Sequence, residues 1–467
     1  MGAGMSAEPA VVPVAPAAPA VPGAAEVAGL IRRGELSAVE HVTQVLAAID
    51  RAQAGTAAWA YVDHRGALAA AARADALRAD GRPLGPLHGV AIGVKDVIAV
   101  AGMPLRAGSR ATSEVPDATD AACVARLRAA GAVVVGKTTT HEFASGQGDP
   151  GTRSPHLPEH HPGGSSVGSA VAVAAGTVGA ALATDTTGSI RTPAAAQGVV
   201  GFKPARGAVP TAGLLAFSPT LDVIGPIGRT VADCRVVHEA LAGVPTGTGT
   251  GRPPRSRRPV LAVPDPDPAR SADPDFRVAL AHALADLAAA GVELVPCRAP
   301  SYAHGLTAAL VLSLVEALPL HAARLAARGA DYLPATRRLI AGGALLDADD
   351  LAAAHRAADR IRRELADLRA STGADAVVGL TLPGPQPLLA EAVTALTAPP
   401  EQGSLAAGIH HLSAANLTGA PAISLPIGTA CGHPVGLHLL GLDDDRALLD
   451  LAATVERSLA PAGSTRR

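Results

Sequence analysis

The sequence predicts an α/β protein, because segments with helical apolar spacing alternate with short apolar strands. Two segments show the same unit, a helix that stops at a glycine and is followed by a short buried strand. The units are a helix over 120–130, Gly131 and a strand over 132–135, and a helix over 273–290, Gly291 and a strand over 292–295. Their recurrence favours a sheet with helices packed against it.

Helices are also predicted on either side of these units. Residues 24–33 have helical spacing, and a second helix is expected to begin at Ala38 after a Gly-Glu-Leu-Ser break. Ser37 is a suitable N-cap, and Glu40 three residues later completes a capping box. A long, almost wholly helical insert is predicted over 302–370.

The chain is expected to form one large domain over 24–467. Residues 1–23 are apolar and rich in proline, and the first basic residue is Arg32, so they predict a disordered leader rather than a secretory signal. The segment 243–259 has the composition of a loop or linker.

Composition excludes several classes of function. The 467 residues carry a formal net charge of −2 and only 2% are aromatic, which argues against nucleic acid and anionic membranes as partners. The four cysteines are far apart and form no CxxC pair, so neither a disulfide framework nor a zinc site is expected, and a reducing, cytoplasmic location fits. No uncharged apolar stretch of about 20 residues predicts a membrane span.

Lysine is scarce in this chain. Of 39 basic residues only Lys95, Lys137 and Lys203 are lysines. Because a guanidinium group stays protonated and a buried ammonium group can lose its proton, each retained lysine is a candidate base, with packing as the alternative.

Three short patterns match known motifs but lack the context that their mechanisms need. Residues 131–138 fit a phosphate-binding loop, yet the loop positions are strand-forming valines. Residues 146–151 fit a dinucleotide fingerprint, yet no helix follows. Residues 164–168 fit a nucleophile elbow on Ser166, yet a proline-rich segment precedes them instead of a strand.

Histidines cluster in two places without carboxylates at metal-ligand spacing. They are His156, His160 and His161, and the pair His410 and His411. We interpret them as polar loop residues rather than metal ligands.

The chemistry is expected in the segment 163–194, where two small, serine-bearing turns flank one apolar element. This arrangement could bring Ser165 and Ser189 together. Small residues around Ser189 leave backbone amides accessible for an oxyanion hole. A serine nucleophile needs a base. No histidine occurs between His161 and His238, so the base must come from elsewhere in the chain, and the scarcity of lysine makes Lys95 a candidate.

These motifs resemble the amidase signature family over roughly 24–458, most densely over 84–235. The resemblance rests on the following segments: PLHGVAIGVKD, TDAACVARLRAAGAVVVGKT with HEFA, GGSS…TDTTGSIRTPAA, GVVGFKP, SPTLDVIGPIGRTVADC, NLTGAPAISLPIG and PVGLHLLG. It implies a central mixed, twisted β-sheet covered by helices on both faces. It also implies an amidase that cleaves a carboxamide C–N bond through an acyl-enzyme, without a cofactor or metal.

Carried over by motif, the family's catalytic lysine falls on Lys95, its bridging serine, held by a cis peptide, on Ser165, and its nucleophile on Ser189. The implied oxyanion-hole amides are those of Thr186, Thr187, Gly188 and Ser189. Asp185 and Arg191 match positions that we interpret as buried supports of the nucleophile turn. The implied relay requires a neutral Lys95, so its pKa should be lowered by burial or by nearby positive charge.

Two positions depart from the family pattern. Thr187 and Val167 stand where the family usually has glycine, which tolerates positive φ and close backbone approach. Either the oxyanion turn is altered or both backbones lie in ordinary regions, and the sequence does not separate these outcomes.

The partner and the substrate also stay open. The alternatives to a stand-alone amidase are the component of a transfer-RNA amidotransferase that releases ammonia from glutamine, and a non-catalytic protein on the same fold. A small-molecule amide is the expected substrate, and a homodimer is a further alternative. Specificity is expected to reside in the segments 145–162, 302–345 and 380–412.

Overall fold

A computed structural model describes residues 21–82, 84–243, 257–265, 272–298, 301, 305–392 and 410–460. The predicted leader falls almost wholly outside these ranges, as does most of the predicted linker. The paragraphs below concern the described residues.

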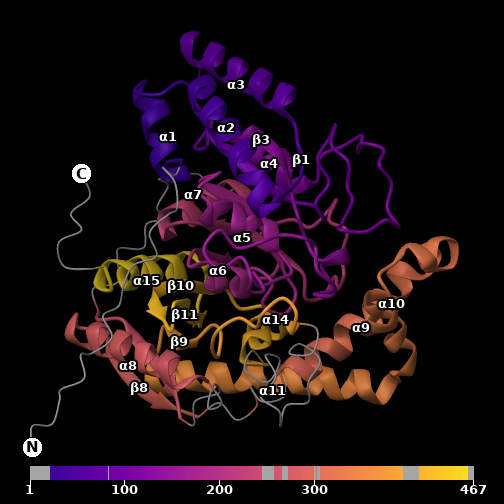
Figure 1. The fold of residues 1–467 in the computed structure, drawn as a ribbon. Coiled ribbons are helices and arrows are strands. Elements are labelled where there is room, and N and C mark those ends of the chain that lie inside the picture. Colours follow the sequence, from indigo (N-terminus) through magenta and orange to yellow (C-terminus); the bar gives the residue numbers. More distant parts are fainter. Residues whose placement is uncertain are drawn as a thin grey trace, which may run out of the picture.

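One mixed sheet of eleven strands organises the molecule (Figure 1). In sheet order the strands are β1 (Trp59–Val62), β3 (Val133–Thr138), β2 (Ala91–Lys95), β4 (Ala180–Asp185), β6 (Val223–Gly228), β5 (Val200–Lys203), β10 (Ala422–Ala430), β11 (His433–Gly441), β9 (Ala376–Leu380), β7 (Val260–Pro264) and β8 (Glu293–Cys297). β2 pairs in parallel with β3 and β4, β7 pairs in parallel with β8 and β9, and the remaining neighbours are antiparallel. The predicted α/β class with a mixed sheet is confirmed.

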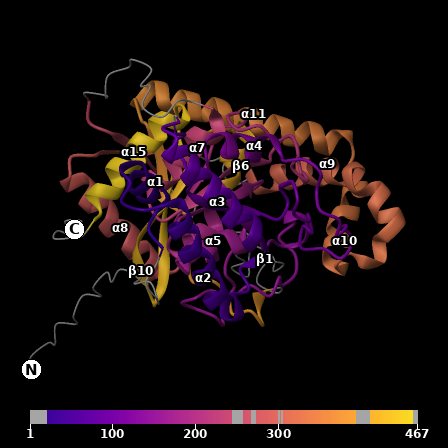
Figure 2. The same cartoon turned by 90° about the horizontal axis from the view of Figure 1, so that it is seen from above.

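Helices cover this sheet. They are α1 (Ala24–Arg33), α2 (Ala38–Thr56), α3 (His64–Ala79), α4 (Ala122–Ala129), α5 (Val167–Ala174), α6 (Arg191–Gln197), α7 (Val231–Ala242), α8 (Pro274–Ala289), α9 (Gly305–Arg328), α10 (Pro334–Ala341), α11 (Ala348–Thr372), α14 (Ser413–Thr418) and α15 (Asp445–Ser458), with short 3₁₀ turns η1 (Glu142–Ala144), η3 (Gly329–Asp331), η4 (Gly342–Leu345) and η6 (His410–Leu412). α5 and α6 contact each other and the central strands, whereas α7, α8 and α15 form a separate packed group against the sheet. α9 and α10 extend to one edge of the molecule in both views (Figures 1 and 2).

Local sequence rules account for most element boundaries. The predicted capping box at Ser37 is present, with the Glu40 amide bonded to the Ser37 hydroxyl and the Glu40 carboxylate bonded to the Ser37 amide. Both helix-glycine-strand units are found, as α4 with β3 and α8 with β8. β3 runs on to Thr138, beyond the predicted end at Val135, because β1 and β2 pair with it on both sides.

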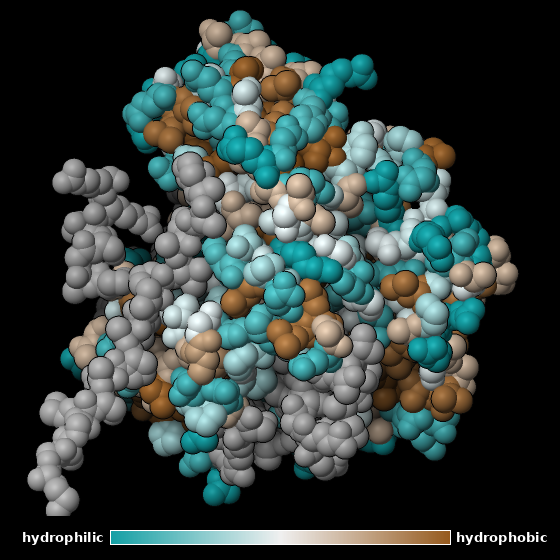
Figure 3. Space-filling model, viewed as in Figure 1, coloured by the Kyte–Doolittle hydropathy of each residue, from teal (hydrophilic) through white to brown (hydrophobic). Residues whose placement is uncertain are grey.

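α9 is the described helix that reaches membrane-spanning length and hydropathy, with a value of 1.7 over its most apolar window. Its central Glu316 accepts hydrogen bonds from the Ser218 hydroxyl at 2.7 Å and the Thr220 amide at 3.0 Å. The helix also packs against α10, α11 and α14. Apolar side chains form small separate groups on the face drawn in Figure 3. Length and composition are therefore weak grounds for a membrane span here.

Candidate active site

Three parallel strands bring their carboxyl ends to one edge of the sheet. β2 ends at Lys95, β3 at Thr138 and β4 at Asp185, and β2 pairs with both of the others. Loops that follow parallel strands at the same edge converge, and such edges are common positions for ligand sites. The serine turns that lead into α5 and α6 meet there.

Lys95 is fully buried and contacts two hydroxyl groups. Its Nζ lies 2.8 Å from Ser165 Oγ and 2.7 Å from Thr184 Oγ1. Within the described part of the chain, no carboxylate oxygen lies within 4 Å of this nitrogen. The structure therefore joins two of the three predicted catalytic residues by a direct hydrogen bond.

The environment of Lys95 favours its neutral form. Burial lowers the pKa of Lys95 to about 7, although Asp222 and Asp185 act in the opposite direction. Burial, the first of the two alternative causes named from the sequence, is therefore the one found, and the charged neighbours that act on Lys95 are carboxyl groups. A lysine with a pKa near 7 is about half neutral at neutral pH and can accept a proton.

Several hydrogen bonds to main-chain carbonyls hold the Gly164–Ser165 segment in place. The Gly164–Ser165 peptide is cis, as the resemblance implied. The Ser165 carbonyl accepts hydrogen bonds of 3.2 Å from the His141 amide and the Thr140 hydroxyl. The Thr192 hydroxyl donates to the Gly164 carbonyl at 2.6 Å. These bonds tie the first serine turn to the loop after β3 and to α6.

Ser189 lies half-buried in the loop between β4 and α6. It lines the same cavity as Ser165. Among the described groups, no hydrogen bond joins its Oγ to Ser165 or to another side chain. The structure thus places the predicted nucleophile beside the Lys95–Ser165 pair without a closed relay, as is common before substrate binds.

A buried ion pair supports the nucleophile turn. Arg191 Nη2 lies 3.0 Å from Asp185 Oδ1, and Arg191 Nε lies 3.1 Å from Oδ2. Burial opposes ionisation of Asp185, but Arg191 outweighs it and holds the pKa of this carboxyl well below its usual range. Asp185 also accepts the Gly188 amide at 2.8 Å and the Ile190 amide at 3.0 Å. The predicted supporting role of the pair matches this geometry.

Sequence reasoning missed two members of this network. Asn416 on α14 donates to the Asp185 carbonyl and carboxylate and accepts from Arg191 at 2.8 Å. His438 on β11 lies 3.0 Å from Arg191 Nη1. Asn416 lies within the motif NLTGAPAISLPIG and His438 within PVGLHLLG, so the resemblance offered a signal for both residues.

The four predicted oxyanion-hole amides are not equivalent. The Gly188 amide is already bonded to Asp185, so it is directed at the supporting carboxylate. The amides of Thr186, Thr187 and Ser189 have no acceptor among the described residues, and all three residues border the cavity. The Thr186 hydroxyl donates to Asp222 at 2.6 Å, and burial raises the pKa of that carboxyl to about 6.

The two departures from the family pattern fit ordinary backbone geometry. Neither Thr187 nor Val167 is among the non-glycine residues with positive φ. In the first serine turn the position that requires glycine is Gly168, the residue after Val167. A Cβ at Gly168 would lie 2.3 Å from the Ala58 carbonyl oxygen and the Thr139 nitrogen. Thr187 instead adds its side chain to the cavity wall.

The other two lysines lie outside this cluster. Lys137 forms a buried ion pair with Asp96 at 2.8 Å. Lys203 donates to the Pro204 carbonyl at 2.9 Å, and burial, followed by the charge of Arg191, lowers its pKa to about 7. A lowered pKa alone therefore does not identify the base, whereas the contact with Ser165 does distinguish Lys95.

The rejected motifs have structural explanations. The phosphate-loop pattern lies on strand β3, and no helix follows the 146–151 segment. Ser166 is buried, and its hydroxyl donates to the Thr184 carbonyl at 3.1 Å. His161 lies in a loop, as predicted, and also lines the cavity beside His141.

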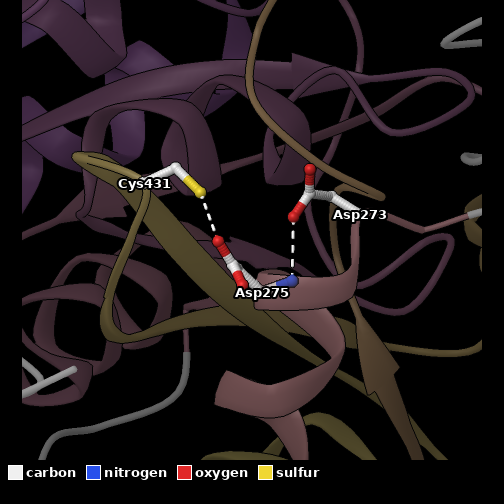
Figure 4. Close-up of side chains that lie close together, drawn as sticks. All are labelled: Asp273, Asp275 and Cys431. Carbon is white, nitrogen blue, oxygen red and sulfur yellow. Dashed lines mark hydrogen bonds between the residues drawn. The ribbon is translucent and has the colours of Figure 1, made fainter. Parts of the chain in front are cut away.

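The described residues include one group of three potential metal ligands, and none of the three lines the cavity (Figure 4). Asp273 caps α8 by accepting the Asp275 amide at 2.9 Å, and the exposed Cys431 thiol lies 2.6 Å from the Asp275 carboxylate. Helix capping and one hydrogen bond account for this cluster.

Comparison with known proteins settles the family. The family model described as Amidase matches residues 40–449. The chain belongs to the amidase family. It is an enzyme that hydrolyses amide bonds, in keeping with its relatives and with the resemblance stated from its motifs.

Relatives in the family divide between components of amidotransferases and amidases. A curated relative from Salinispora arenicola, which is one of the subunits of a glutamyl-tRNA(Gln) amidotransferase, is 35% identical over 94% of this chain and 97% of its own length. The crystal structure of an amidase aligns with a TM-score of 0.83 at 30% identity, covering 93% of this chain and 99% of the other. The peptide amidase of Stenotrophomonas maltophilia aligns with a TM-score of 0.75 at 28% identity, covering 93% and 96%.

Proposed function

We propose that this amidase cleaves a small carboxamide through an acyl-enzyme on Ser189, with Ser165 as the bridging residue and Lys95 as the base. The observation that carries the proposal is the 2.8 Å contact between Ser165 Oγ and a buried lysine without an ion-pair partner in the described chain. No cofactor is needed, and we place the enzyme in the cytoplasm as a soluble protein.

The proposed reaction moves one proton along the three side chains. Neutral Lys95 accepts a proton from Ser165, which accepts one from Ser189, and Ser189 Oγ attacks the amide carbonyl carbon. The amides of Thr186, Thr187 and Ser189 stabilise the tetrahedral oxyanion. The relay returns the proton to the leaving nitrogen as the C–N bond breaks. Water then attacks the ester, which yields the carboxylate and restores Ser189.

Labelling with a fluorophosphonate probe tests the proposed nucleophile. We expect one adduct by intact mass, mapped to Ser189 and absent from Ser189→Ala. Ser313→Ala removes another cavity-lining serine and should keep the adduct. An adduct elsewhere, or none on folded protein, would overturn the assignment of Ser189.

A second function is favoured by the similarity to a component of an amidotransferase. In that case the same site would release ammonia from glutamine for a partner protein. Glutaminase activity of the isolated chain, or a partner that copurifies with it and stimulates that activity, would support this alternative. Turnover of simple amides without glutaminase activity would support the stand-alone amidase.

A further inference from the structure

The cavity beside the two serines has an uncharged lining. Its volume is about 150 Å³, and the described residues that form its wall include no Asp, Glu, Lys or Arg. Its apolar lining residues include Leu310 and Leu314 of α9 and Leu339 of α10. Its lining also includes three neutral polar side chains with ring or amide nitrogens, His141, His161 and Gln386. All three segments predicted to govern specificity contribute to this wall.

His141 lines the cavity with unmet hydrogen-bonding capacity. Its ring is buried, and neither nitrogen has a partner in the described structure. The ring packs on the backbone before Ser165, since a Cβ at Gly164 would lie 2.3 Å from its Cε1. Burial, with smaller effects from His161 and Lys95, lowers the pKa of His141 to about 3. The ring is therefore neutral at physiological pH and offers one donor and one acceptor.

His161 and Gln386 extend this polar wall. The His161 ring stacks on His141 with centroids 5.4 Å apart, and its Nδ1 accepts the Gly163 amide at 3.2 Å. The proton of neutral His161 is therefore assigned to Nε2. The Gln386 side chain lines the same cavity. The Gln386 amide nitrogen is buried and has no partner of its own among the described residues.

Unmet groups of this kind are costly unless something binds them. A buried donor without an acceptor destabilises a protein by about 1–3 kcal/mol, and folded proteins leave few of them. A leucine at position 141 would fill a similar volume without that cost. Ligand binding gives a physical reason for an imidazole at this place, next to Ser165 and Ser189.

We propose that this wall binds electrically neutral amides with a compact apolar acyl group, and that His141 is a specificity-determining residue that hydrogen-bonds a polar atom of the bound amide. The inference rests on the proposed function, because it assigns the substrate class of the same site. An empty cavity of about 150 Å³ accommodates a benzene-sized group. Free glutamine would bring an ammonium and a carboxylate group into a wall that offers no opposite charge, which is unfavourable. The nearby Asp149 lies outside this wall and is paired with Arg153 at 2.8 Å.

Binding to the Ser189→Ala protein tests the substrate class without turnover. Titration calorimetry should give dissociation constants for benzamide and butanamide at least about tenfold lower than for glutamine. Butanamide is glutamine without its two charged groups, so this pair isolates the effect of charge. Glutamine binding as tightly as butanamide, or no measurable binding of either neutral amide, would overturn the proposal.

The role of His141 is tested by His141→Leu in the same background. We expect benzamide affinity to fall about tenfold, while the Tm stays equal or rises because an unmet polar group is removed. His88→Gln is the matched control, since buried His88 is bonded to the Ala74 carbonyl at 2.9 Å and does not line the cavity. It should leave affinity unchanged. Unchanged affinity in His141→Leu, or a large fall in its Tm, would assign His141 a packing role instead.

The outcome of the binding experiments can be distinguished from the outcome of the labelling experiment that tests the proposed nucleophile. Fluorophosphonate labelling of wild-type Ser189 reports on the nucleophile, whereas calorimetry on Ser189→Ala reports on the wall. Labelling together with preferred glutamine binding would keep the nucleophile and reject the neutral-amide proposal. Preferred binding of neutral amides without labelling would support the neutral-amide proposal and reject Ser189 as the nucleophile.

Discussion

Adjacent strands β2 and β3 each bury a lysine at the same end, and the two lysines have opposite surroundings. Lys137 on β3 lies 2.8 Å from the Asp96 carboxylate and 3.3 Å from the Pro104 carbonyl. Lys95 on β2 contacts only the hydroxyls of Ser165 and Thr184 within hydrogen-bond distance in the described structure. A carboxylate beside a buried lysine stabilises the charged form of the lysine. Burial beside hydroxyls alone favours the neutral form.

This difference separates a structural cation from a candidate base. Lys203 shows that burial is insufficient for the distinction, because its pKa is also lowered to about 7 while its ammonium nitrogen bonds to a main-chain carbonyl and to no hydroxyl among the described residues. What sets Lys95 apart is the hydroxyl of a cavity-lining serine at 2.8 Å. The comparison can be tested by exchanging or removing each lysine.

The largest expected effect is on turnover in Lys95→Arg. Arginine keeps the positive charge but cannot act as a neutral base, so we expect kcat/KM on an amide substrate to fall at least about 10³-fold. Circular dichroism and Tm measured alongside should show a folded protein. Lys95→Met is the second variant, since it removes the base without adding a bulky cation to a buried site. Near-normal turnover in either folded variant would eliminate Lys95 as the base.

The next effect concerns the free energy of unfolding. Here substitution of Lys137 should cost more than substitution of Lys95, the reverse of their expected effects on turnover. Lys137→Met leaves the Asp96 carboxyl buried without its cation, and breaking a buried ion pair costs about 3–5 kcal/mol. Lys95→Met breaks no ion pair and exchanges side chains of similar size, so a change below about 1.5 kcal/mol is expected. Urea unfolding at pH 7 measures both. Equal losses would mean that Lys95 is as structural as Lys137.

Much of this comparison could be predicted from the sequence. Local chemistry marks the ends of helices, so glycine stops and the capping box at Ser37 locate α1, α2, α4 and α8 closely. The scarcity of lysine directed attention to Lys95, and the serine turns to Ser165 and Ser189. The pairing of Lys95 with Ser165 was implied by the resemblance, and the two side chains are 2.8 Å apart.

The rest depends on contacts between distant segments, which a single sequence does not encode locally. Thr184 and Asp222 gain their roles from the pairing of β4 with β6, and Asn416 reaches Asp185 from α14. The spacing of His161 along the sequence does not reveal that its ring stacks on His141, which packs against Gly164. The Gly188 amide was assigned to the oxyanion hole because a motif gives the position of an amide but not its direction.

The smallest effect concerns Thr184, a positioning residue that acts through Lys95. Because neutral Lys95 is the active form, kcat/KM should rise about tenfold per pH unit below about 7 and level off above it. Thr184→Val removes a hydrogen-bond acceptor that favours the ammonium form more than the amine, so the pKa of Lys95 should fall and the rise should shift to lower pH. The plateau should drop about two- to tenfold, in line with the loss of one hydrogen bond.

Thr138→Val provides the matched control for this shift. Thr138 is equally buried at the end of β3, but its hydroxyl is bonded to Ser169 at 2.7 Å rather than to Lys95. It should therefore lower the Tm by a similar amount and leave the midpoint of the pH profile in place. A shift in both variants would trace the midpoint to general loosening of the site, and a shift in neither would mean that Thr184 does not tune Lys95. A shift confined to Thr184→Val would show that the hydroxyls around Lys95, and not burial alone, set the pH at which this amidase becomes active.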